Sequence, residues 1–395
     1  MNEKNFIVFL KYIFSNNWKY RDSILFLGIL VCFSLIANYH LSLGFSMSSD
    51  SARFSRWADD LIRLNFNFFE FYSIDKASHR PSLFFFSIPV LSISLCKIFF
   101  VNEWQFAFLI LNLILVFLSL LIFVKVLLLI EVRPILILSI LPIITLSVDI
   151  LVWPRFILSD MLYAFIVIVA TYIIIKTIIR NKIYFFEIIG IIFLLLASRP
   201  SSIPIVSAII FFIAIYRFKM FSLKKNILLF LSGIVVLIPF ILATLYMVIE
   251  FKFSGIPKID FLTNMVKKGM IVHDRPDTWV ETPSNFIDVM FIYFLRLTNF
   301  FNPYASSFSV VHIIINIFHI TLIFLSILVW SFFSIEIKIQ DKIFLFIITL
   351  SLFVGTFHSF ILIDYDWRYR FPIILPLLMM VPISFENIIR KINLK

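Results

Sequence analysis

The sequence predicts an all-α polytopic membrane protein with about ten transmembrane helices and further interfacial helices in its outer loops. Of its 395 residues, 62% are apolar, only 14% are charged, and 51 are phenylalanine. Apolar runs of roughly 18 or more residues recur along the chain, and this is the length that an α-helix needs to cross a bilayer. The runs are continuous and lack the alternation of an outer-membrane barrel, so membrane strands are not expected.

Eleven apolar segments are candidate helices, at 23–45, 83–100, 104–124, 134–152, 156–175, 184–197, 203–217, 227–250, 308–333, 343–363 and 371–388. Clusters of Lys and Arg between them, which mark cytoplasmic ends, predict that both termini lie in the cytoplasm. Two termini on one side require an even number of crossings, so one segment is expected not to cross. Segment 83–100 is short and contains Pro89, Lys97 and several serines. We expect it to lie in the interface or to re-enter.

These segments divide the chain into three parts: a membrane core at 1–250 with its first outer loop at 46–82, a long outer segment at 251–307, and C-terminal membrane helices at 308–395. Lys dominates the clusters predicted to face the cytoplasm, whereas Arg dominates the predicted outer loops. The planar guanidinium of Arg binds phosphate or carboxylate with two parallel hydrogen bonds, which an ammonium cannot do. The arginines therefore predict an anion site on the outer face. The net charge of +11 is assigned to membrane topology, with no nucleic-acid partner.

The first outer loop has the pattern of an amphipathic helix on the outer leaflet. Phe54, Trp57, Ala58 and Leu61 share one face at helical spacing, and charged residues occupy the other. Asp50 stands at the exit of the first span. A carboxylate at membrane level is costly unless it is paired or used, so Asp50 is a candidate functional residue.

Two further outer turns carry charged candidates. Asp160 ends the short loop 153–160 and is expected just inside the next helix, where a carboxylate favours a helix N-terminus. Asp149 and Arg155 are close enough in sequence to pair with it. Arg199 lies in "SRPSS", a Pro-broken turn near the membrane surface, which requires protein or a cavity to satisfy its backbone.

The last outer loop, "DYDWRYRFP" at 364–372, combines Arg368, Tyr369 and Arg370 with other aromatic and acidic residues. One interpretation is an aromatic belt with paired charges. Two arginines beside aromatic rings would also suit a lipid phosphate with an attached sugar.

Three histidines are polar residues in otherwise apolar surroundings. His273 belongs to the long outer segment and is expected over a cavity. His312 and His319 share one helix face but are two turns apart, whereas metal ligands on a helix are more often three or four residues apart. We therefore favour a hydrogen-bonded core role for them.

Several short motifs occur in one order along the chain. They are "DSARFSRWADDL" from Asp50, "HRPSL" from His79, "RFILSDMLY" around Asp160, "ASRPSSI" around Arg199 and "RYRFPIILP" from Arg368. In this order they resemble the GT-C membrane glycosyltransferases, in the family-39-related branch of protein O-mannosyltransferases and lipid A aminoarabinose transferases. The resemblance implies interfacial helices that cover a cavity at the outer leaflet, and a polyprenyl-phosphate-linked sugar as donor.

The resemblance also implies roles for these residues. Asp50 would be the catalytic base of an inverting transfer, and Asp160 would orient the acceptor or a basic side chain. Cations would stabilise the leaving lipid phosphate, a role that we assign to Arg370, Arg368 and Arg199. Further expected substrate-binding residues are Arg53, His79, Arg80 and Tyr369.

The same resemblance sets expectations for partners and location. The acceptor is an envelope glycan, lipid or protein, and no cofactor is assigned, although a divalent metal between Asp50 and Asp160 is left open. The expected location is the bacterial inner (plasma) membrane as a multi-pass protein. Both termini are then cytoplasmic, and the active site faces the periplasm or the cell exterior.

Two other function classes stay open. A lipid-linked saccharide flippase or transporter often has internal repeats and charges in mid-helix, whereas this sequence has no clear repeat and gathers its charges at one face. An envelope polysaccharide polymerase would have a large, late, Arg-rich outer loop, and 251–307 partly fits this pattern. Its Lys content and the early Asp50 loop favour a transferase.

Overall fold

The computed structural model describes residues 20–73, 83–217, 264–273, 275–304, 308–333, 339–361 and 366–393. Across these ranges the regular secondary structure is helical, and Ser46 and Phe156 form an isolated parallel β-bridge. The predicted all-α class is therefore confirmed for the described part of the chain.

Six helices are long and apolar enough to cross a membrane: α2 (Arg21–Leu43), α6 (Trp104–Leu129), α9 (Asp160–Arg180), α15 (Val310–Phe333), α16 (Ile339–Ile361) and α17 (Asp366–Asn393). A seventh span is possible by length if α7 (Pro134–Thr145) joins the segment Val148–Arg155. That segment comprises α8 (Val148–Val152) and the short helix η3 (Trp153–Arg155), and it is bent by 51° from α7.

The described residues do not show the predicted ten spans. The segments predicted at 184–197 and 203–217 form α10 (Phe185–Leu196) and α11 (Ile203–Arg217), of 12 and 15 residues. At about 1.5 Å per residue, neither reaches the roughly 30 Å of a bilayer core. The predicted span at 227–250 lies outside the described residues.

Segment 83–100 also forms only short helices, η2 (Leu83–Phe86) and the 13-residue α5 (Ser87–Phe99). Together they form one apolar helical run, Leu83–Phe99, which is not among the candidate spans of the described residues, and that this segment does not cross stays a prediction. α5 packs against α3 (Ser49–Arg63) and α6. The Lys97 ammonium joins α5 to α3, since it donates to the Asp59 carboxylate at 2.7 Å and to the Ser55 carbonyl at 3.0 Å.

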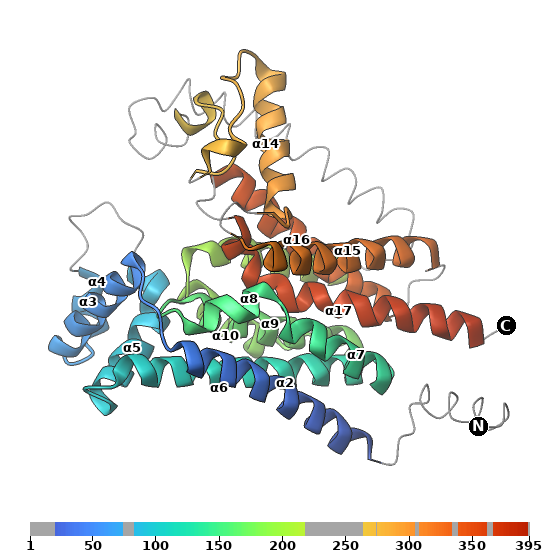
Figure 1. The fold of residues 1–395 in the computed structure, drawn as a ribbon, viewed down its shortest axis with the longest axis horizontal. Helices are drawn as coiled ribbons and strands as arrows, with labels where there is room; N and C mark the ends of the chain where they lie inside the picture. The colour runs from blue at the N-terminus through green and yellow to red at the C-terminus, as the bar shows by residue number, and fades with distance from the viewer. Residues whose placement is uncertain are drawn as a thin grey trace.

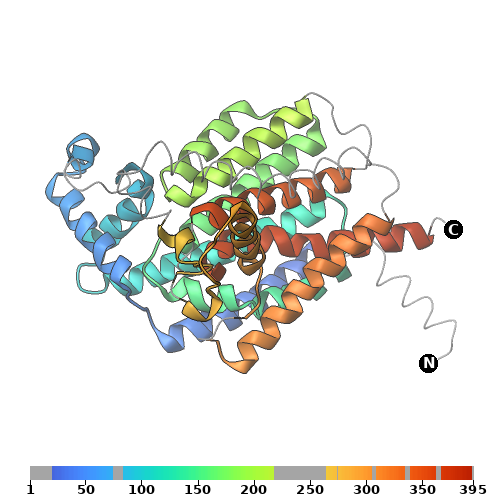
Figure 2. The ribbon, with the colours of Figure 1, turned by 90° about the horizontal axis from the view of Figure 1, so that it is seen from above.

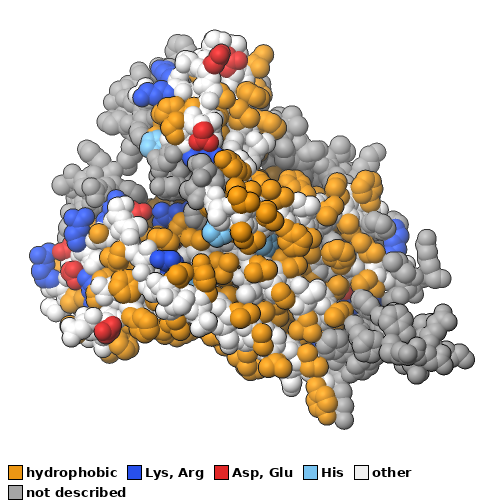
Figure 3. Space-filling view, viewed as in Figure 1, with side chains coloured by type: hydrophobic (Ala, Val, Ile, Leu, Met, Phe, Trp, Pro, Cys, Tyr) orange, Lys and Arg blue, Asp and Glu red, His pale blue; other side chains and the backbone are white. Residues whose placement is uncertain are grey.

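The amphipathic helix predicted in segment 46–82 is present in its described part. In α3 the apolar face buries Phe54, Ala58 and Leu61, and a capping box between Ser48 and Ser51 starts the helix. Hydrophobic side chains cover most of the visible face of the helical body, whereas charged side chains gather around α3 and at the far end of α14 (Phe286–Phe300) (Figure 3). α3 is therefore an amphipathic helix at one end of the apolar bundle.

The long helices lie side by side, with α6 against α9, α9 against α17, and α17 against α15 and α16 (Figure 1). Seen from above, α10 and α11 lie together along one edge, and α15 runs obliquely beside α17 (Figure 2). α2 begins and α17 ends toward the same end of the helical body (Figure 1).

The C-terminal part of α17 is held by a buried carboxylate. Glu386 accepts hydrogen bonds from the main-chain nitrogen of Arg133 at 3.0 Å and from Nε of Arg390 at 2.9 Å. Burial of a carboxylate is tolerated where guanidinium and amide groups satisfy it. This end of α17 is thus fixed, while its other end carries Arg368, Tyr369 and Arg370.

A smaller core forms around α14 and residues 264–273. At its centre the buried Arg296 donates from Nε and Nη2 to the carbonyl of Met270, at 3.0 and 2.7 Å, and from Nη1 to the carbonyl of Ser359 at 3.4 Å. Burial lowers the pKa of Arg296 to about 10. These bonds join α14 and residues 264–273 to α16.

Candidate functional site

Two loops that are far apart in the sequence are joined by main-chain hydrogen bonds next to the candidate site. The main-chain nitrogen of Ser46 donates to the carbonyl of Arg155 at 2.8 Å, and that of Ile157 donates to the carbonyl of Ser46 at 3.2 Å. Asn112 of α6 holds the same loop through a 2.9 Å bond to the carbonyl of Pro154. The loop that leads into α3 and the loop that leads into α9 therefore run together, which places Asp50 near Asp160.

The guanidinium of Arg368, at the start of α17, bridges the two carboxylates. Its Nε and Nη2 donate to Asp160 at 3.1 and 3.0 Å, and its Nη1 lies 3.5 Å from Oδ2 of Asp50. Arg199, in the turn that contains Pro200, pairs with Oδ1 of Asp160, which also accepts from Nε of Arg368. Arg53 lies 3.5 Å from Asp50 within α3. We call Asp50, Arg53, Asp160, Arg199 and Arg368 the carboxylate–arginine cluster.

The two carboxylates of this cluster differ in accessibility. The side chain of Asp160 is 1% exposed and is satisfied by two guanidinium groups, whereas that of Asp50 is 36% exposed. A buried carboxylate between two cations is held in one place and has no room for a ligand. Asp50 is thus the carboxylate of the cluster that can meet a substrate.

Aromatic rings cover the arginines of the cluster. The guanidinium carbon of Arg199 lies 5.2 Å from the ring centre of Tyr369, and that of Arg368 lies 5.5 Å from the ring centre of Trp153. The ring of Tyr369 also contacts the ring of His358, with 4.4 Å between ring centres. His358 in turn stacks on Phe300, with 5.7 Å between ring centres. Cation–π and stacking contacts of this kind hold planar cations in orientation.

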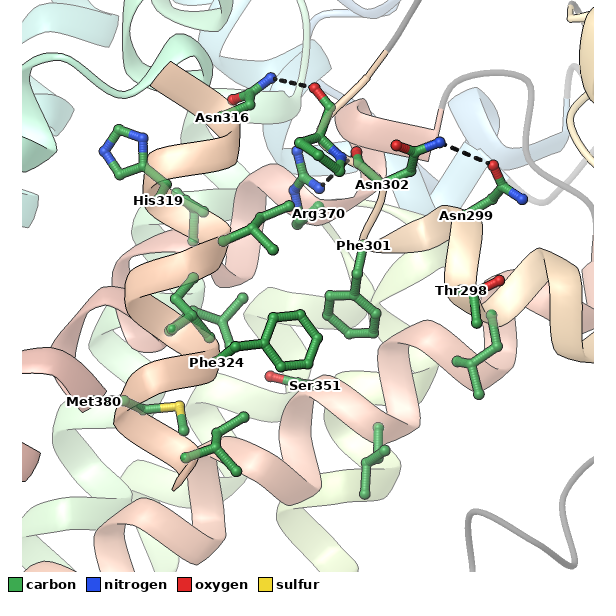
Figure 4. A pocket seen from close by; sticks show the side chains of 18 of the residues that line it. Thr298, Asn299, Phe301, Asn302, Asn316, His319, Phe324, Ser351, Arg370 and Met380 are labelled. Carbon is green, nitrogen blue, oxygen red and sulfur yellow. Dashed lines mark hydrogen bonds between the residues drawn. The ribbon is translucent and has the colours of Figure 1, made fainter. Parts of the chain in front are cut away.

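Arg370 belongs to a different surface from Arg368 and Arg199. It lines a pocket of about 610 Å³ between α14, α15, α16 and α17, and its Nη1 donates to the carbonyl of Asn302 at 3.3 Å. Figure 4 shows Arg370, Asn302, Asn316 and His319 at one end of this pocket and Phe324 and Met380 further along it. The pocket is therefore amphiphilic, with a polar end and long apolar walls.

The suggested pairing of Asp149 or Arg155 with Asp160 is wrong, because Arg199 and Arg368 occupy that carboxylate. Asp149 instead lines the same pocket as Arg370 and His319. The bend between α7 and α8 turns Asp149 toward this pocket, and a bend of this kind leaves no periodic signal in the sequence.

The predicted core role of His319 is confirmed, since its Nδ1 lies 2.8 Å from the carbonyl of Ile315 and its Nε2 lies 2.7 Å from that of Ile143. For His312 the predicted core position is wrong, because the residue is partly exposed and its ring lies 6.2 Å from that of Phe308. Within the described ranges, His, Cys, Asp and Glu form no group of three or more that could hold a metal ion.

Some predicted residues cannot be placed. His79 and Arg80 lie outside the described residues. In the described part of the chain, three residues at the site had no individual role in the sequence-based prediction: Asn112, Trp153 and His358. Each is a single polar or aromatic residue within an apolar segment. Polar groups in such segments are costly unless they are used, and this pattern could have identified these residues from the sequence.

Comparisons with known proteins add no assignment. No family model matches the chain, and neither a curated protein nor a solved structure matches it.

Proposed function

We propose that this protein is an integral membrane glycosyltransferase of the GT-C type. It moves a sugar from a polyprenyl-phosphate donor to an envelope glycan, lipid or protein on the extracytoplasmic face. The observation that carries the proposal is the partly exposed Asp50, joined through Arg368 to the buried Asp160 at one end of an apolar helical bundle.

Asp50 acts as the general base. It takes the proton from an acceptor hydroxyl or amine while the acceptor atom forms a bond to the anomeric carbon. The bond from that carbon to the phosphate oxygen breaks on the opposite face, so the sugar is transferred with inversion and a polyprenyl phosphate leaves. The exposure of Asp50 and its contacts with Arg53 and Arg368 support this role, since they leave the carboxylate accessible and hold it in one orientation.

Asp160 acts through the arginines and is a positioning residue. Its carboxylate holds Arg199 and Arg368 side by side, and both are covered by aromatic rings. Cations fixed in advance where negative charge develops lower the barrier for departure of the phosphate. Of the two expected roles for Asp160, orientation of basic side chains is the one that its burial supports.

The amphiphilic pocket supports a lipid-linked donor. Arg370 is at its polar end, and its walls are built from Leu, Ile, Phe and Met side chains of the membrane helices. A pocket of this size and composition fits part of an isoprenoid chain, with the phosphate at Arg370. Arg368, two residues before Arg370 on α17, belongs to the cluster and faces a different surface, so the donor phosphate is placed at Arg370 with its sugar extending toward Asp50.

The orientation of the protein in the membrane and its number of transmembrane spans are also part of the proposal. The basic segments put both termini in the cytoplasm of a bacterial inner membrane, and the common direction of the α2 start and the α17 end supports this (Figure 1). The cluster, at the other end of α17, then faces the periplasm or the cell exterior. A total of about ten spans requires further crossings outside the described residues.

The test is mass spectrometry of envelope glycans and polyprenyl lipids from a host that lacks this gene. Complementation uses wild type, Asp50→Asn and Asp60→Asn, each at equal membrane abundance. Asp60 is the matched control, because it lies on α3 and pairs with Arg63 at 2.8 Å, away from the cluster. One sugar should disappear, a polyprenyl-phosphate sugar should accumulate, and only Asp50→Asn should fail to restore the glycan. Accumulation of diphosphate-linked oligosaccharides would instead indicate the polymerase or the flippase.

A further inference from the structure

Two buried side chains that line the pocket have polar atoms without a partner. Asp149 is 2% exposed and Arg370 is 3% exposed, and both line the cavity. Oδ1 of Asp149 and Nε of Arg370 have no hydrogen-bond partner among the described residues. Because buried polar atoms are nearly always satisfied, these two atoms indicate a ligand that offers an acceptor to Arg370 and a donor to Asp149. A carboxyl group keeps an acceptor oxygen in either protonation state, so this pairing does not depend on the charge of Asp149.

Other polar side chains of the pocket are already bonded. Both ring nitrogens of His319 lie against main-chain carbonyls, and Asn316 donates to the carbonyl of Pro303 at 3.3 Å. Asn302 donates to the side chain of Asn299 at 3.2 Å (Figure 4). Among the described residues that line the pocket, Arg370 supplies the one cationic group and Asp149 the one carboxyl group.

The part of the pocket that Asp149 and Arg370 line is beside the carboxylate–arginine cluster. The main-chain nitrogen of Trp153, one turn after Asp149, donates to the Asp149 carbonyl. The ring centre of Trp153 lies 5.5 Å from the guanidinium carbon of Arg368 and 6.5 Å from the ring centre of Phe371, the residue after Arg370. A headgroup bound by Asp149 and Arg370 is therefore next to the arginines of the cluster.

We propose that Asp149 and Arg370 form a two-point site for a phosphate-linked polyol headgroup. Arg370 binds an oxygen of the phosphate, since a guanidinium forms strong, charge-assisted hydrogen bonds with phosphate. Asp149 accepts a hydrogen bond from a ring hydroxyl of the group that the phosphate carries. The ionised oxygens of a phosphate diester only accept hydrogen bonds, so a second group with a donor is needed to satisfy a carboxyl acceptor.

This inference rests on the proposed function and makes it more specific. The donor sugar then has a hydroxyl group that reaches Asp149 while its phosphate is at Arg370. Asp149 is a specificity-determining residue, because a site whose buried polar groups pair with a substrate hydroxyl rejects an analogue that lacks it. Phosphodiester lipids with an apolar substituent are therefore excluded from the site.

The experiment measures the binding of two synthetic lipids to the full chain in nanodiscs. They are a polyprenyl inositol phosphate and a polyprenyl cyclohexyl phosphate of the same chain length. Both are phosphate diesters with a six-membered ring, and they differ in the ring hydroxyls. Inositol has a hydroxyl at every free ring carbon, so the test does not require the identity of the natural sugar. Neither ring has an anomeric carbon, so the lipids bind without being consumed.

Wild type should bind the inositol lipid about tenfold more tightly than the cyclohexyl lipid, because an unpaired buried acceptor is costly. Asp149→Leu and Asp149→Ala remove the acceptor and should reduce this preference to about threefold or less. Arg370→Ala should weaken the binding of both lipids by about tenfold, since both carry the phosphate.

The matched control is Asp341→Ala. Asp341 is also a buried carboxylate, but it accepts a hydrogen bond from Trp330 at 2.6 Å and is not among the residues that line the pocket. This variant should keep the wild-type preference. Two Asp149 variants are used so that poor folding of one of them does not prevent the comparison.

The outcomes separate the two claims. Equal binding of the two lipids by wild type, a preference that persists in the Asp149 variants, or an equal loss of preference in Asp341→Ala overturns the inference and leaves the phosphate site at Arg370 intact. Failure of wild type to bind either lipid, or binding that Arg370→Ala does not weaken, overturns the donor site in the proposed function.

Discussion

Arg368 and Asp160 form a two-point ion pair, with Nε and Nη2 of the arginine 3.1 and 3.0 Å from the two carboxylate oxygens. The two residues lie in the first turns of α17 and α9, so this pair joins the start of one membrane helix to the start of another. The third nitrogen of the same guanidinium reaches Asp50, 3.5 Å away. One planar side chain thus fixes the distance between a buried carboxylate and an accessible one.

The first prediction concerns Asp160→Asn. The change leaves Arg199 and Arg368 close together and largely buried without a counter-charge, and loss of one partner from a buried pair costs about 3–5 kcal/mol. Thermal unfolding in detergent should therefore begin at a clearly lower temperature. Asp60→Asn, which removes an exposed pair with Arg63, should cost no more than about 1 kcal/mol. Equal shifts for the two variants would show that Asp160 does not hold the arginines.

A second prediction concerns Arg368→Lys, which keeps the charge and loses the planar fork. An ammonium cannot bind both oxygens of Asp160 and still reach Asp50. We expect transfer activity to fall about 100-fold, as for loss of one transition-state donor, with little change in membrane abundance. The measurement is the rate of donor consumption in membranes that contain equal amounts of each variant. Full activity of Arg368→Lys would mean that the shared guanidinium is not required.

A third prediction concerns the stack of Arg199, Tyr369, His358 and Phe300. His358→Ala opens a gap beside Tyr369 and should lower activity about three- to tenfold, because aromatic pairs contribute about 0.5–1.5 kcal/mol each. His358→Phe preserves a flat ring and should retain most of the activity. If the two variants are equally impaired, the imidazole acts through its nitrogens and not through stacking.

A fourth prediction concerns the pH dependence of α14. Hydrogen bonds from the main chain and side chain of Ser284 and from Asn285 hold the pKa of the exposed Asp288 below its usual value. The stability from this capping box is therefore complete above the ordinary aspartate pKa and is lost as the pH falls through the lower folded-state pKa. The protection of amides in the first turn of α14, measured as exchange relative to the intrinsic rate at each pH, should decrease below about pH 4 in wild type. In Asp288→Asn the protection should not change over that range, and an equal decrease in both proteins would refute the role of Asp288.

Much of the architecture could be predicted because its signals are local. The apolar runs predicted a helical membrane protein, and the spacing of Phe54, Ala58 and Leu61 predicted the amphipathic α3. The ordered motifs also selected Asp50, Asp160, Arg199 and Arg368, which the structure brings together.

The partners of these residues could not be predicted, because they depend on three-dimensional packing. Asp149 was expected near Asp160 but lines the pocket with Arg370, since the chain bends by 51° between α7 and α8. Arg370 was grouped with Arg368, although side chains two residues apart on a helix point to different sides. The predicted number of transmembrane spans exceeds the number seen in the described residues, because a hydropathy pattern does not show where a helix ends within an apolar segment.

The central claim is that Asp50 is the base for sugar transfer from a polyprenyl phosphate, and one assay tests it most directly. Purified protein in nanodiscs is mixed with the lipid extract and the envelope fraction of a host that lacks the gene, which supply donor and acceptor. Mass spectrometry then follows the conversion of the polyprenyl-phosphate sugar to polyprenyl phosphate. Wild type and Asp60→Asn should convert the donor, and Asp50→Asn should not. Conversion by Asp50→Asn at the wild-type rate would contradict the account.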